Sequence, residues 1–419
     1  MTNQKEKRKV PELRFPEFRG EWEEKKLNEI ASFYKGKGIS KSDISEDGVN
    51  CILYGELYTK YGFQINEVYS RTDINENTLF EGFKNDVLVP SSGETAIDIA
   101  TASSLNVNNT YLGGDINVIR PNDAHNGHFI SLSINGKNKK ELSKLAQGKT
   151  VVHLYNNELK KLKINFPSIK EQQKIGEFFS KLDRQIELEE KKLALLEEQK
   201  KGYMQKIFSQ ELRFKDEHGE DYPEWEKTKL KNTKAIFTDG NYGESYPKES
   251  DFVSKEGIPF IRGNNLVNGE IILENVKFIS YEKNKELVTG QLLKNDIVIS
   301  VRGSIGQIGF VSNIEEGSNI NSQLAIIRIK DEKINNKFLN YYFLSKEGQK
   351  EISKSITGTA LKQLPINKMK EVNVIIPTIE EQLKIILIMD NISQIIKKQK
   401  KKIKLLDNKK KYMLNALLY

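Results

Sequence analysis

The chain has 419 residues with 66 Lys and Arg against 58 Asp and Glu, and its formal net charge of +8 favours an acidic partner such as nucleic acid. Its length allows roughly two to four domains that each bury a core, and its single cysteine, Cys51, excludes an internal disulfide framework and a multi-cysteine zinc site. The charged start has no apolar segment behind it and no apolar run reaches the ~18 residues of a membrane helix, so we expect a cytoplasmic protein without a secretory signal.

The sequence contains one module twice, with the copies about 210 residues apart. The repeated segments are Lys-Asn-Asp at 84–86 and 294–296, Glu-Gln-x-Lys-Ile at 171–175 and 381–385, and Glu-Leu-Arg-Phe at 12–15 and 211–214. Two copies with so long a period indicate a tandem domain duplication and not a solenoid. A pseudo-twofold chain of this kind suits a two-part target.

Each copy carries short aliphatic or β-branched runs that are typical of buried strands. We predict strands at 86–89, 116–120 and 162–166 in the first copy, and at 296–299, 324–329 and 372–376 in the second. The last strand of each copy ends at a proline, Pro167 or Pro377. The expected fold class is α+β, with two similar mixed α/β domains and two long helices.

Beyond each proline the apolar period changes from 2 to 3.5 residues. Ser168-x-x-Glu171 and Thr378-x-x-Glu381 have the spacing of capping boxes, in which a hydroxyl and a carboxylate satisfy free N–H groups of a first helical turn. Most a and d positions of both following helices are apolar, which predicts a coiled coil. A helix from Glu171 to Ile207 would be about 55 Å long and would hold the two globular parts apart.

The polar exceptions in this seam predict that the two helices pair antiparallel within one chain. A parallel pair in register would oppose Lys200 and Lys410, whereas an antiparallel pair can set Glu189 opposite Lys410 and Lys200 opposite Gln399. A shift by one heptad would set each polar residue against an aliphatic one, at a cost of roughly 1–3 kcal/mol apiece. A homodimerisation coil is the alternative. The expected seam contains Ile186, Glu189, Leu193, Leu196 and Lys200, and Ile396, Gln399, Ile403, Leu406 and Lys410.

Two similar globular parts that are each followed by a long helix resemble the specificity subunit of type I restriction–modification enzymes. The resemblance covers nearly the whole chain, and the segments that carry it are Pro11 to Phe18, Gly20-Glu21-Trp22, Pro167 to Ile175 and Pro377 to Ile385, with the loops at Gly93 and Arg302-Gly303-Ser304-x-Gly306. In that family each globular part is a target-recognition domain that reads half of an interrupted DNA site. The resemblance therefore implies target-recognition domains at 1–166 and 210–376, and spacer helices at 167–209 and 377–419.

The same resemblance implies a chain that binds double-stranded DNA and docks two modification subunits but is not itself an enzyme. In the family those methyltransferase subunits use S-adenosylmethionine, and restriction and translocase subunits use ATP and Mg²⁺, so we expect no cofactor or metal in this chain. The sequence has no Asn-Pro-Pro-aromatic or Asp-Pro-Pro-aromatic tetrad for amino-group methylation, which also disfavours a fused single-chain restriction enzyme. A non-catalytic coiled-coil scaffold that binds proteins through its two duplicated domains is the alternative.

Loop positions that the repeat marks are the candidates for DNA contact. Lys and Arg can neutralise phosphates, while Arg, Asn, Gln and Ser can bond to base edges. The candidates are Lys35, Lys37, Ser91, Ser92, Glu94, Lys149 and Thr150 in the first copy, and Tyr242, Arg262, Asn264, Asn265, Arg302, Ser304, Thr359 and Lys362 in the second. The segment Ser91-Ser92-Gly93-Glu94 lacks the arginine that the second copy has at Arg302, and this difference implies unlike half-sites.

One segment comes close to a phosphate-binding loop. Ser143-x4-Gly148-Lys149-Thr150 lacks the first glycine of that motif, and the preceding residues 139–145 look helical where a strand is required. We therefore interpret Gly148-Lys149-Thr150 and Gly358-Thr359 as matching surface loops that face DNA. A simple turn that ends a helix is the alternative.

Three further groups of residues have a plain and a functional explanation. His125 and His128 could imitate a metal site, but they lack an evident third ligand, so we expect them in a solvated loop. Trp22 and Trp225 are expected to anchor the entry segments in the cores and not to stack on bases. The stretch from Lys397 to Lys411 is rich in lysine, and it is either a solvated helix face or a contact to DNA phosphate or a partner.

Overall fold

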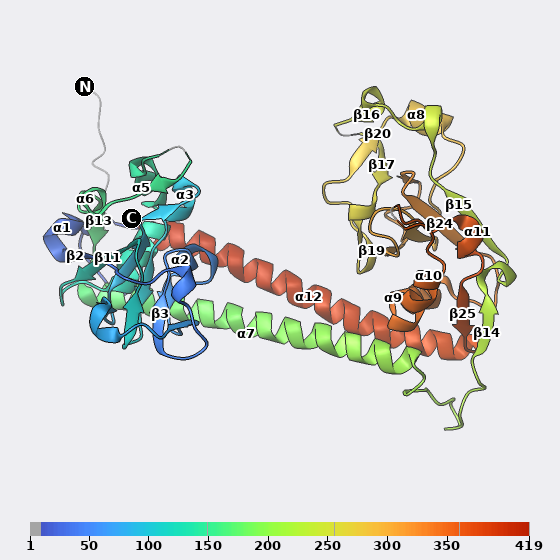
Figure 1. Cartoon of the computed structure of the whole chain (residues 1–419), viewed down its shortest axis with the longest axis horizontal. Helices are drawn as coiled ribbons and strands as arrows, with labels where there is room; N and C mark the ends of the chain where they lie inside the picture. The colour runs from blue at the N-terminus through green and yellow to red at the C-terminus, as the bar shows by residue number, and fades with distance from the viewer. Residues whose placement is uncertain (1–9, 149, 255, 360, 419) are drawn as a thin grey trace. The chain divides into compact units, whose positions relative to one another are not determined.

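The computed structural model describes residues 10–148, 150–254, 256–359 and 361–418 (Figure 1). The chain forms two compact units, which we call the first unit (residues 1–191 and 401–419) and the second unit (residues 192–400). The long helices α7 (Ile169–Phe208) and α12 (Ile379–Leu417) each contribute one part to each unit. None of the described helices is long and apolar enough to cross a bilayer.

The first unit combines short strands with short helices. Its helices, besides the first part of α7 and the end of α12, are α1 (Leu27–Ile30), α2 (Glu56–Thr59), α3 (Ala96–Ile99), α4 (Gly127–Asn135), α5 (Lys139–Leu145) and α6 (Asn156–Leu159). Its strands are β1 (Glu23–Lys26), β2 (Ala31–Lys35), β3 (Val49–Ile52), β4 (Gln64–Ile65), β5 (Ser70–Thr72), β6 (Glu81–Gly82), β7 (Val87–Pro90), β8 (Ser92–Gly93), β9 (Ser103–Leu105), β10 (Thr110–Leu112), β11 (Ile116–Pro121), β12 (Val152–His153) and β13 (Lys163–Phe166). The largest sheet has the order β2-β11-β7-β9-β4, and it is mixed because β4 and β9 are parallel.

The second unit repeats this plan. Its helices, besides the end of α7 and the first part of α12, are α8 (Tyr281–Glu286), α9 (Asn336–Leu344), α10 (Lys346–Lys354) and α11 (Ile366–Met369). Its strands are β14 (Glu226–Lys229), β15 (Ala235–Asp239), β16 (Phe252–Val253), β17 (Ile258–Ile261), β18 (Leu266–Val267), β19 (Gly269–Ile271), β20 (Lys277–Ile279), β21 (Ile297–Ser300), β22 (Ile308–Phe310), β23 (Asn319–Ile320), β24 (Leu324–Ile329) and β25 (Asn373–Ile376). The largest sheet has the order β15-β24-β21-β22-β19-β18, in which β19 and β22 are parallel.

The six strands predicted from the sequence are confirmed as β7, β11 and β13 in the first unit and β21, β24 and β25 in the second. The α+β class with two mixed domains is confirmed as well. All residues of β7 and β21 are buried, as the short aliphatic runs indicated. Trp22 and Trp225 lie in the cores of their units, with 2% and 8% of their surface exposed, which confirms the anchoring role.

A buried ion pair shows that the two copies share one scaffold. In the first unit Arg120 binds both oxygens of Asp86, with Nε–Oδ1 and Nη2–Oδ2 distances of 2.8 and 2.7 Å. In the second unit Arg328 binds Asp296 in the same bidentate way, at 2.7 and 2.6 Å. Both carboxylates are about 1% exposed, so they fix strands β11 and β24 to the loops before β7 and β21.

The two long helices begin with half of the predicted capping box. The amides of Glu171 and Glu381 donate to the hydroxyls of Ser168 and Thr378, each at 3.4 Å. The glutamate carboxylates serve another purpose, because Glu171 accepts two hydrogen bonds from Arg14, both at 2.7 Å. The equivalent pair in the second unit joins Arg213 and Glu381. The glutamates therefore hold the entry segments of their units against the helix starts.

Most apolar a and d residues of both helices are buried or half-buried. Within the first unit Phe179, Leu182 and Ile186 of α7 are buried, and within the second unit Met389 and Ile396 of α12 are buried. The half-buried seam residues are Leu193, Leu196, Ile403 and Leu406. Tyr203 departs from the pattern because it is 44% exposed, and its neighbour Met204 packs against the core in its place.

The helices are antiparallel, as predicted, but the expected pairing of Glu189 with Lys410 is wrong. In the first unit Lys410 binds Asp183, with an Nζ–Oδ1 distance of 2.6 Å, and Lys402 binds Glu189. These ion pairs are displaced by about one heptad from the predicted pairing. The prediction considered only a and d positions, whereas Asp183 flanks the seam and supplies the carboxylate that Lys410 takes. Burial raises the pKa of Asp183, and Lys410 opposes that rise.

Candidate nucleic-acid interface

Two loop ends of the second unit meet at Asn321. Strand β15 ends at Asp239, and the next residue, Gly240, approaches Asn321 so closely that a Cβ atom would lie 2.3 Å from the Asn321 carbonyl oxygen. The Asn321 amide in turn donates to the carbonyl oxygen of Ile261 at 2.9 Å. The segments that begin at Gly240 and Arg262 therefore leave the sheets side by side.

A third loop and a hairpin join this end of the second unit. The Val301 amide donates to the carbonyl oxygen of Gln323 at 2.8 Å, next to Asn321. The Leu364 amide donates to the carbonyl oxygen of Val301 at 3.0 Å, which holds the hairpin of residues 357–363 beside the loop that carries Arg302. These backbone bonds bring together the candidates Tyr242, Arg262, Asn264, Arg302, Ser304, Thr359 and Lys362.

The exposed residues Arg302 and Tyr242 form a side-chain pair at this end. The guanidinium carbon of Arg302 lies 5.1 Å from the centre of the Tyr242 ring. Burial and the nearby carboxylate of Asp239 raise the pKa of Tyr242. A guanidinium that rests on an aromatic ring loses less freedom on binding, and its planar fork fits a guanine edge or a phosphate.

In the turn from Arg262 to Asn265, one side chain is hydrogen-bonded within the protein and two others have polar groups that could contact DNA. Asn265 is buried, and its Oδ1 accepts the Arg262 amide at 3.0 Å while its Nδ2 donates to the carbonyl oxygen of Ile272 at 3.0 Å. Asn265 is therefore buried within the turn and holds its shape. Asn264 is exposed, and the half-buried Arg262 has an Nε–H without a hydrogen-bond partner among the described residues.

The first unit brings its own candidates together in the same way. Ser91 occupies the place of Val301, because its carbonyl oxygen accepts the Leu154 amide at 3.0 Å just as Val301 accepts Leu364. The Ser91 hydroxyl donates to Oδ1 of Asp115 at 3.3 Å, and the ammonium group of Lys35 lies 3.3 Å from the same oxygen. Lys35 is exposed, so it presents a positive charge at the end of β2.

Ser92 connects this cluster to the hairpin of residues 147–153. Strand β8 pairs with β12, so that Ser92 lies opposite His153, and its hydroxyl is 3.0 Å from His153 Nδ1. The His153 ring stacks on Tyr155 with 6.0 Å between ring centres and 17° between planes. Tyr155 is 48% exposed, which leaves an aromatic face available beside the hairpin.

The candidates named from the sequence separate by exposure. The exposed candidates are Lys35, Lys37, Glu94, Thr150, Tyr242, Asn264, Arg302, Ser304, Thr359 and Lys362. Ser91, Ser92 and Asn265 are buried and already hydrogen-bonded, which argues against direct contact with DNA and assigns them to loop shape. Lys149 lies outside the described residues.

Three residues at these loop ends were missed by the sequence reasoning. His153 and Tyr155 alternate along one strand direction after Thr150, and this period of two could have marked them as one face. Gln307 is exposed and lies close to Gly263, whose Cβ position would be 3.7 Å from Gln307 Oε1. No signal in the sequence of a single chain connects the Arg262 turn with Gln307, because only the fold brings them together.

The histidines of the first unit do not form the solvated loop that we expected. His125 and His128 are both buried, and their Nδ1 atoms face Asn122 Oδ1 at 2.6 Å and Ser104 Oγ at 3.2 Å. Burial lowers the pKa of His128 to about 4. Within the described ranges no group of three or more His, Cys, Asp or Glu side chains could hold a metal ion.

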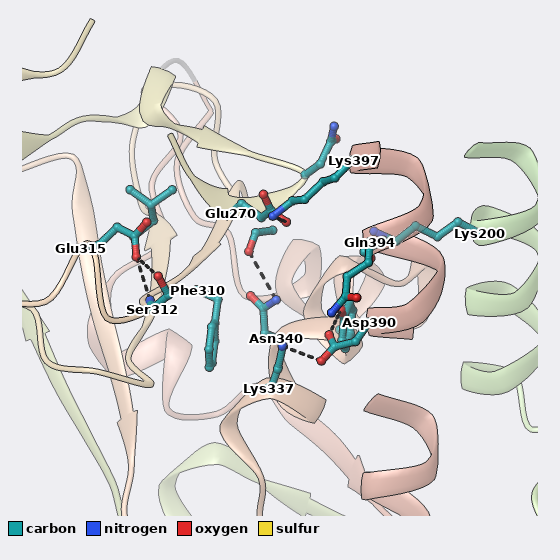
Figure 2. Close-up of a pocket in the computed structure, with 15 residues that line it drawn as sticks. Lys200, Glu270, Phe310, Ser312, Glu315, Lys337, Asn340, Asp390, Gln394 and Lys397 are labelled. Atoms are coloured by element: carbon teal, nitrogen blue, oxygen red, sulfur yellow. Dashed lines mark hydrogen bonds and ion pairs between the residues drawn. The ribbon is translucent and has the colours of Figure 1, made fainter. Parts of the chain in front are cut away.

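The second unit also contains a polar cavity of about 250 Å³ (Figure 2). Most of its charges are compensated inside it, because Lys337 and the Tyr341 hydroxyl bind Asp390 at 2.7 and 2.6 Å, and Lys397 binds Glu270 at 2.8 Å. Lys200 reaches the cavity from α7, and its ammonium group lies 6.0 Å from the centre of the Tyr341 ring. Burial lowers the pKa of Lys200.

Comparison with known proteins agrees with this geometry. Residues 19–198 and 222–405 match the family model described as "Type I restriction modification DNA specificity domain". The specificity subunit of the type I restriction enzyme MjaVIII from Methanocaldococcus jannaschii is 26% identical over 97% of this chain and 93% of its own length. The specificity subunit of the Escherichia coli enzyme EcoBI is 32% identical, but over only 39% of this chain and 34% of its own.

A solved structure supports the fold. The S subunit of a type I restriction–modification system from M. genitalium superposes with a TM-score of 0.60 and 17% identity, over 98% of this chain and 99% of that one. The two matches to the family model lie one in each copy of the repeat and together cover most of the sequence. The chain therefore belongs to the family of type I restriction–modification specificity subunits and carries the DNA specificity domain twice.

Proposed function

We propose that this chain reads a bipartite, interrupted DNA site, with one half-site read by each unit. Each unit uses side chains at its loop ends, which are the exposed Lys35, Lys37, Glu94 and Thr150 in the first unit, and in the second the half-buried Arg262 with the exposed Tyr242, Asn264, Arg302, Ser304, Thr359 and Lys362. Lysines supply affinity by contact with phosphate, and Arg302 and the polar side chains select bases.

One observation carries this proposal: the same backbone frame presents different side chains in the two copies. Strand β2 pairs with β11 as β15 pairs with β24, so the exposed Lys35 corresponds to Asp239. Ser91 corresponds to Val301 through the matching bonds from Leu154 and Leu364. Equivalent loop ends that carry different side chains cannot offer the same hydrogen-bonding groups to base edges, so unlike half-sites follow.

We also propose that the chain docks two methyltransferase subunits and, through them, the subunits that translocate and cleave DNA. In this proposal S-adenosylmethionine is used by the methyltransferase partners, and ATP and Mg²⁺ by the motor partners. The chain itself contributes recognition and assembly but no catalytic residue. The two long helices, which belong to both units, set the gap between the half-sites.

The test is a map of methylated DNA sites in a host that carries the modification subunits, with and without this chain. We expect one split sequence motif to appear with the chain and to vanish without it. The variant Arg302→Ala should cost about 1–3 kcal/mol of binding and relax one base position of a single half-site. Lys227→Ala, an exposed lysine on β14, serves as the control and should leave the motif unchanged.

Two results would contradict the proposal. If no split motif depends on the chain, it does not read DNA, and co-purified proteins would then favour a scaffold. If Arg302→Ala changes both half-sites equally, the units do not read separate halves of the site.

A further inference from the structure

We propose that exposed lysines of α12 in the first unit bind the phosphate backbone of duplex DNA without regard to base sequence. They are Lys401, Lys404, Lys409 and Lys411, which we call the α12 lysine face. This inference rests on the proposed function, because it takes DNA as the ligand. It adds a contact surface that lies apart from the loop ends.

The structure leaves the charges of the α12 lysine face without compensation. All four side chains are exposed, and none forms an ion pair with a residue in the described ranges. The lysines Lys402 and Lys410, which lie between them in the sequence, instead bind Glu189 and Asp183 of α7. The ion pairs with α7 therefore neutralise Lys402 and Lys410, and the ammonium groups of the α12 lysine face can bind an external anion.

Helix geometry places three residues of the α12 lysine face on the side turned away from α7. Successive residues are rotated by about 100°, so Lys401, Lys404 and Lys411 lie on the arc opposite the seam residues Ile403 and Leu406, while Lys409 lies at the flank of that arc. Leu405 and Tyr412 share this arc and are 59% and 56% exposed. Asp407, the only acid from Lys397 to Lys411, is half-buried near its edge.

The matching arc of α7 has a different charge, although both helices come from one repeat. The positions that correspond to the α12 lysine face are Lys191, Ala194, Gln199 and Lys201. Of these, Lys191 is held by Glu187, with an Nζ–Oε1 distance of 2.6 Å. None of the four lysines forms an ion pair with α7 in the described ranges, so helix pairing does not account for their accumulation on α12, which points to an anionic ligand.

Duplex DNA fits this surface by charge and by length. The four lysines extend over about 15 Å of helix, and a duplex carries one negative charge per ~1.7 Å of its axis, so several phosphates can lie within reach. The end of α12 also packs on the end of α4 in its own unit. A Cβ atom on Gly136, at the end of α4, would lie 3.2 Å from Leu414, and α5 leads from there to the hairpin of residues 147–153.

The experiment compares two full-length variants that lose the same charge. In the first variant the four lysines of the α12 lysine face become glutamine. In the matched control Lys181, Lys191, Lys192 and Lys201 of α7, all exposed, become glutamine. Each protein, purified with the subunits that accompany it, is titrated with its specific duplex and with a random duplex at several salt concentrations.

We expect the α12 variant to reduce the slope of log affinity against log salt by ~2–4 on both duplexes, because each lost phosphate contact contributes ~0.9. The preference for the specific over the random duplex should stay unchanged, and the α7 control should reduce the slope by less than one. An unchanged slope, an equal reduction in the control, or the loss of a protein partner in place of the salt effect would overturn the inference. A wild-type chain that never prefers the specific duplex would instead overturn the proposed function.

Discussion

The buried pair of Arg213 and Glu381 allows a sharp test of how the entry segment is held in the second unit. Glu381 has no exposed surface, and its oxygens accept Nε and Nη2 of Arg213, both at 2.8 Å, and Nε1 of Trp225 at 3.0 Å. The change Arg213→Met removes the only cation bound to this carboxylate in the described structure. An uncompensated buried charge costs about 3–5 kcal/mol, so we expect a loss of that size in the second unit.

Tryptophan fluorescence can report the two units separately because each contains one tryptophan. In a Trp22→Phe background, Trp225 reports the urea unfolding of the second unit alone. With an m-value near 2–3 kcal/mol per molar urea, the expected loss lowers the midpoint by roughly 1–2.5 M. The double change Arg213→Met with Glu381→Met should recover most of the midpoint, since it removes the stranded charge as well.

The first unit provides the matched comparison. Arg14 binds Glu171 in the same bidentate way, but the Trp22 Nε1–H has no hydrogen-bond partner among the described residues. Arg14→Met, followed through Trp22 in a Trp225→Phe background, should therefore cost at least as much as Arg213→Met. A loss below 1 kcal/mol in either unit, or a double variant no better than the single one, would refute this reasoning.

Three further predictions concern single side chains. Gly358 has a φ of +89°, and a Cβ atom there would lie 2.4 Å from a carbonyl oxygen across the hairpin, so Gly358→Ala should cost about 1–3 kcal/mol and alter only the half-site of the second unit in methylation maps. Gly317→Ala is the control, because Gly317 has a similar φ of +83° but open space around it, and it should leave the methylation map unchanged. His128 has a pKa of about 4 in the folded chain against ~6.5 unfolded, so the unfolded chain binds the proton first as pH drops from 6.5 to 4. The free energy of unfolding of the first unit should fall by up to ~3 kcal/mol over this range, seen as a falling urea midpoint that His128→Gln does not show. Ser393 of α12 corresponds to Asp183 of α7 in the repeat, and it lines the cavity together with Lys200. Ser393→Asp should therefore form an ion pair with Lys200, as Asp183 does with Lys410, and raise the stability of the second unit by ~0.5–1 kcal/mol. An unchanged urea midpoint would count against that pairing.

The fold could be predicted where apolar residues follow a local pattern in the sequence. The aliphatic runs that became β7 and β21 and the heptads of α7 and α12 are local patterns, and each formed the predicted element. The pairing of Lys410 could not be predicted in the same way. Asp183 and Glu189 both lie within reach of lysines on α12, and the pairing of Lys410 with Asp183 depends on side-chain reach that heptad positions do not encode.

The candidate interface could be predicted as a set of loops but not residue by residue. Glycines and strand ends located the loops that carry Arg302 and Thr359, and both residues are exposed. The polar type of Ser91 and Asn265 indicated contact with DNA, yet both satisfy their hydrogen bonds inside the protein. A small polar residue serves equally well to close a turn, and only burial distinguishes the two uses.

The end of α12 has a consequence for how the chain is made. Leu414, Leu417 and Leu418 belong to the same core as Trp22 and Phe179, and the Leu13 amide donates to the Ala416 carbonyl oxygen at 2.8 Å. A ribosome therefore finishes residues 192–400 before it releases the leucines that close the earlier core. Until then the apolar side chains that these leucines cover remain exposed in the nascent first unit, and we expect aggregation to start from this partly folded chain.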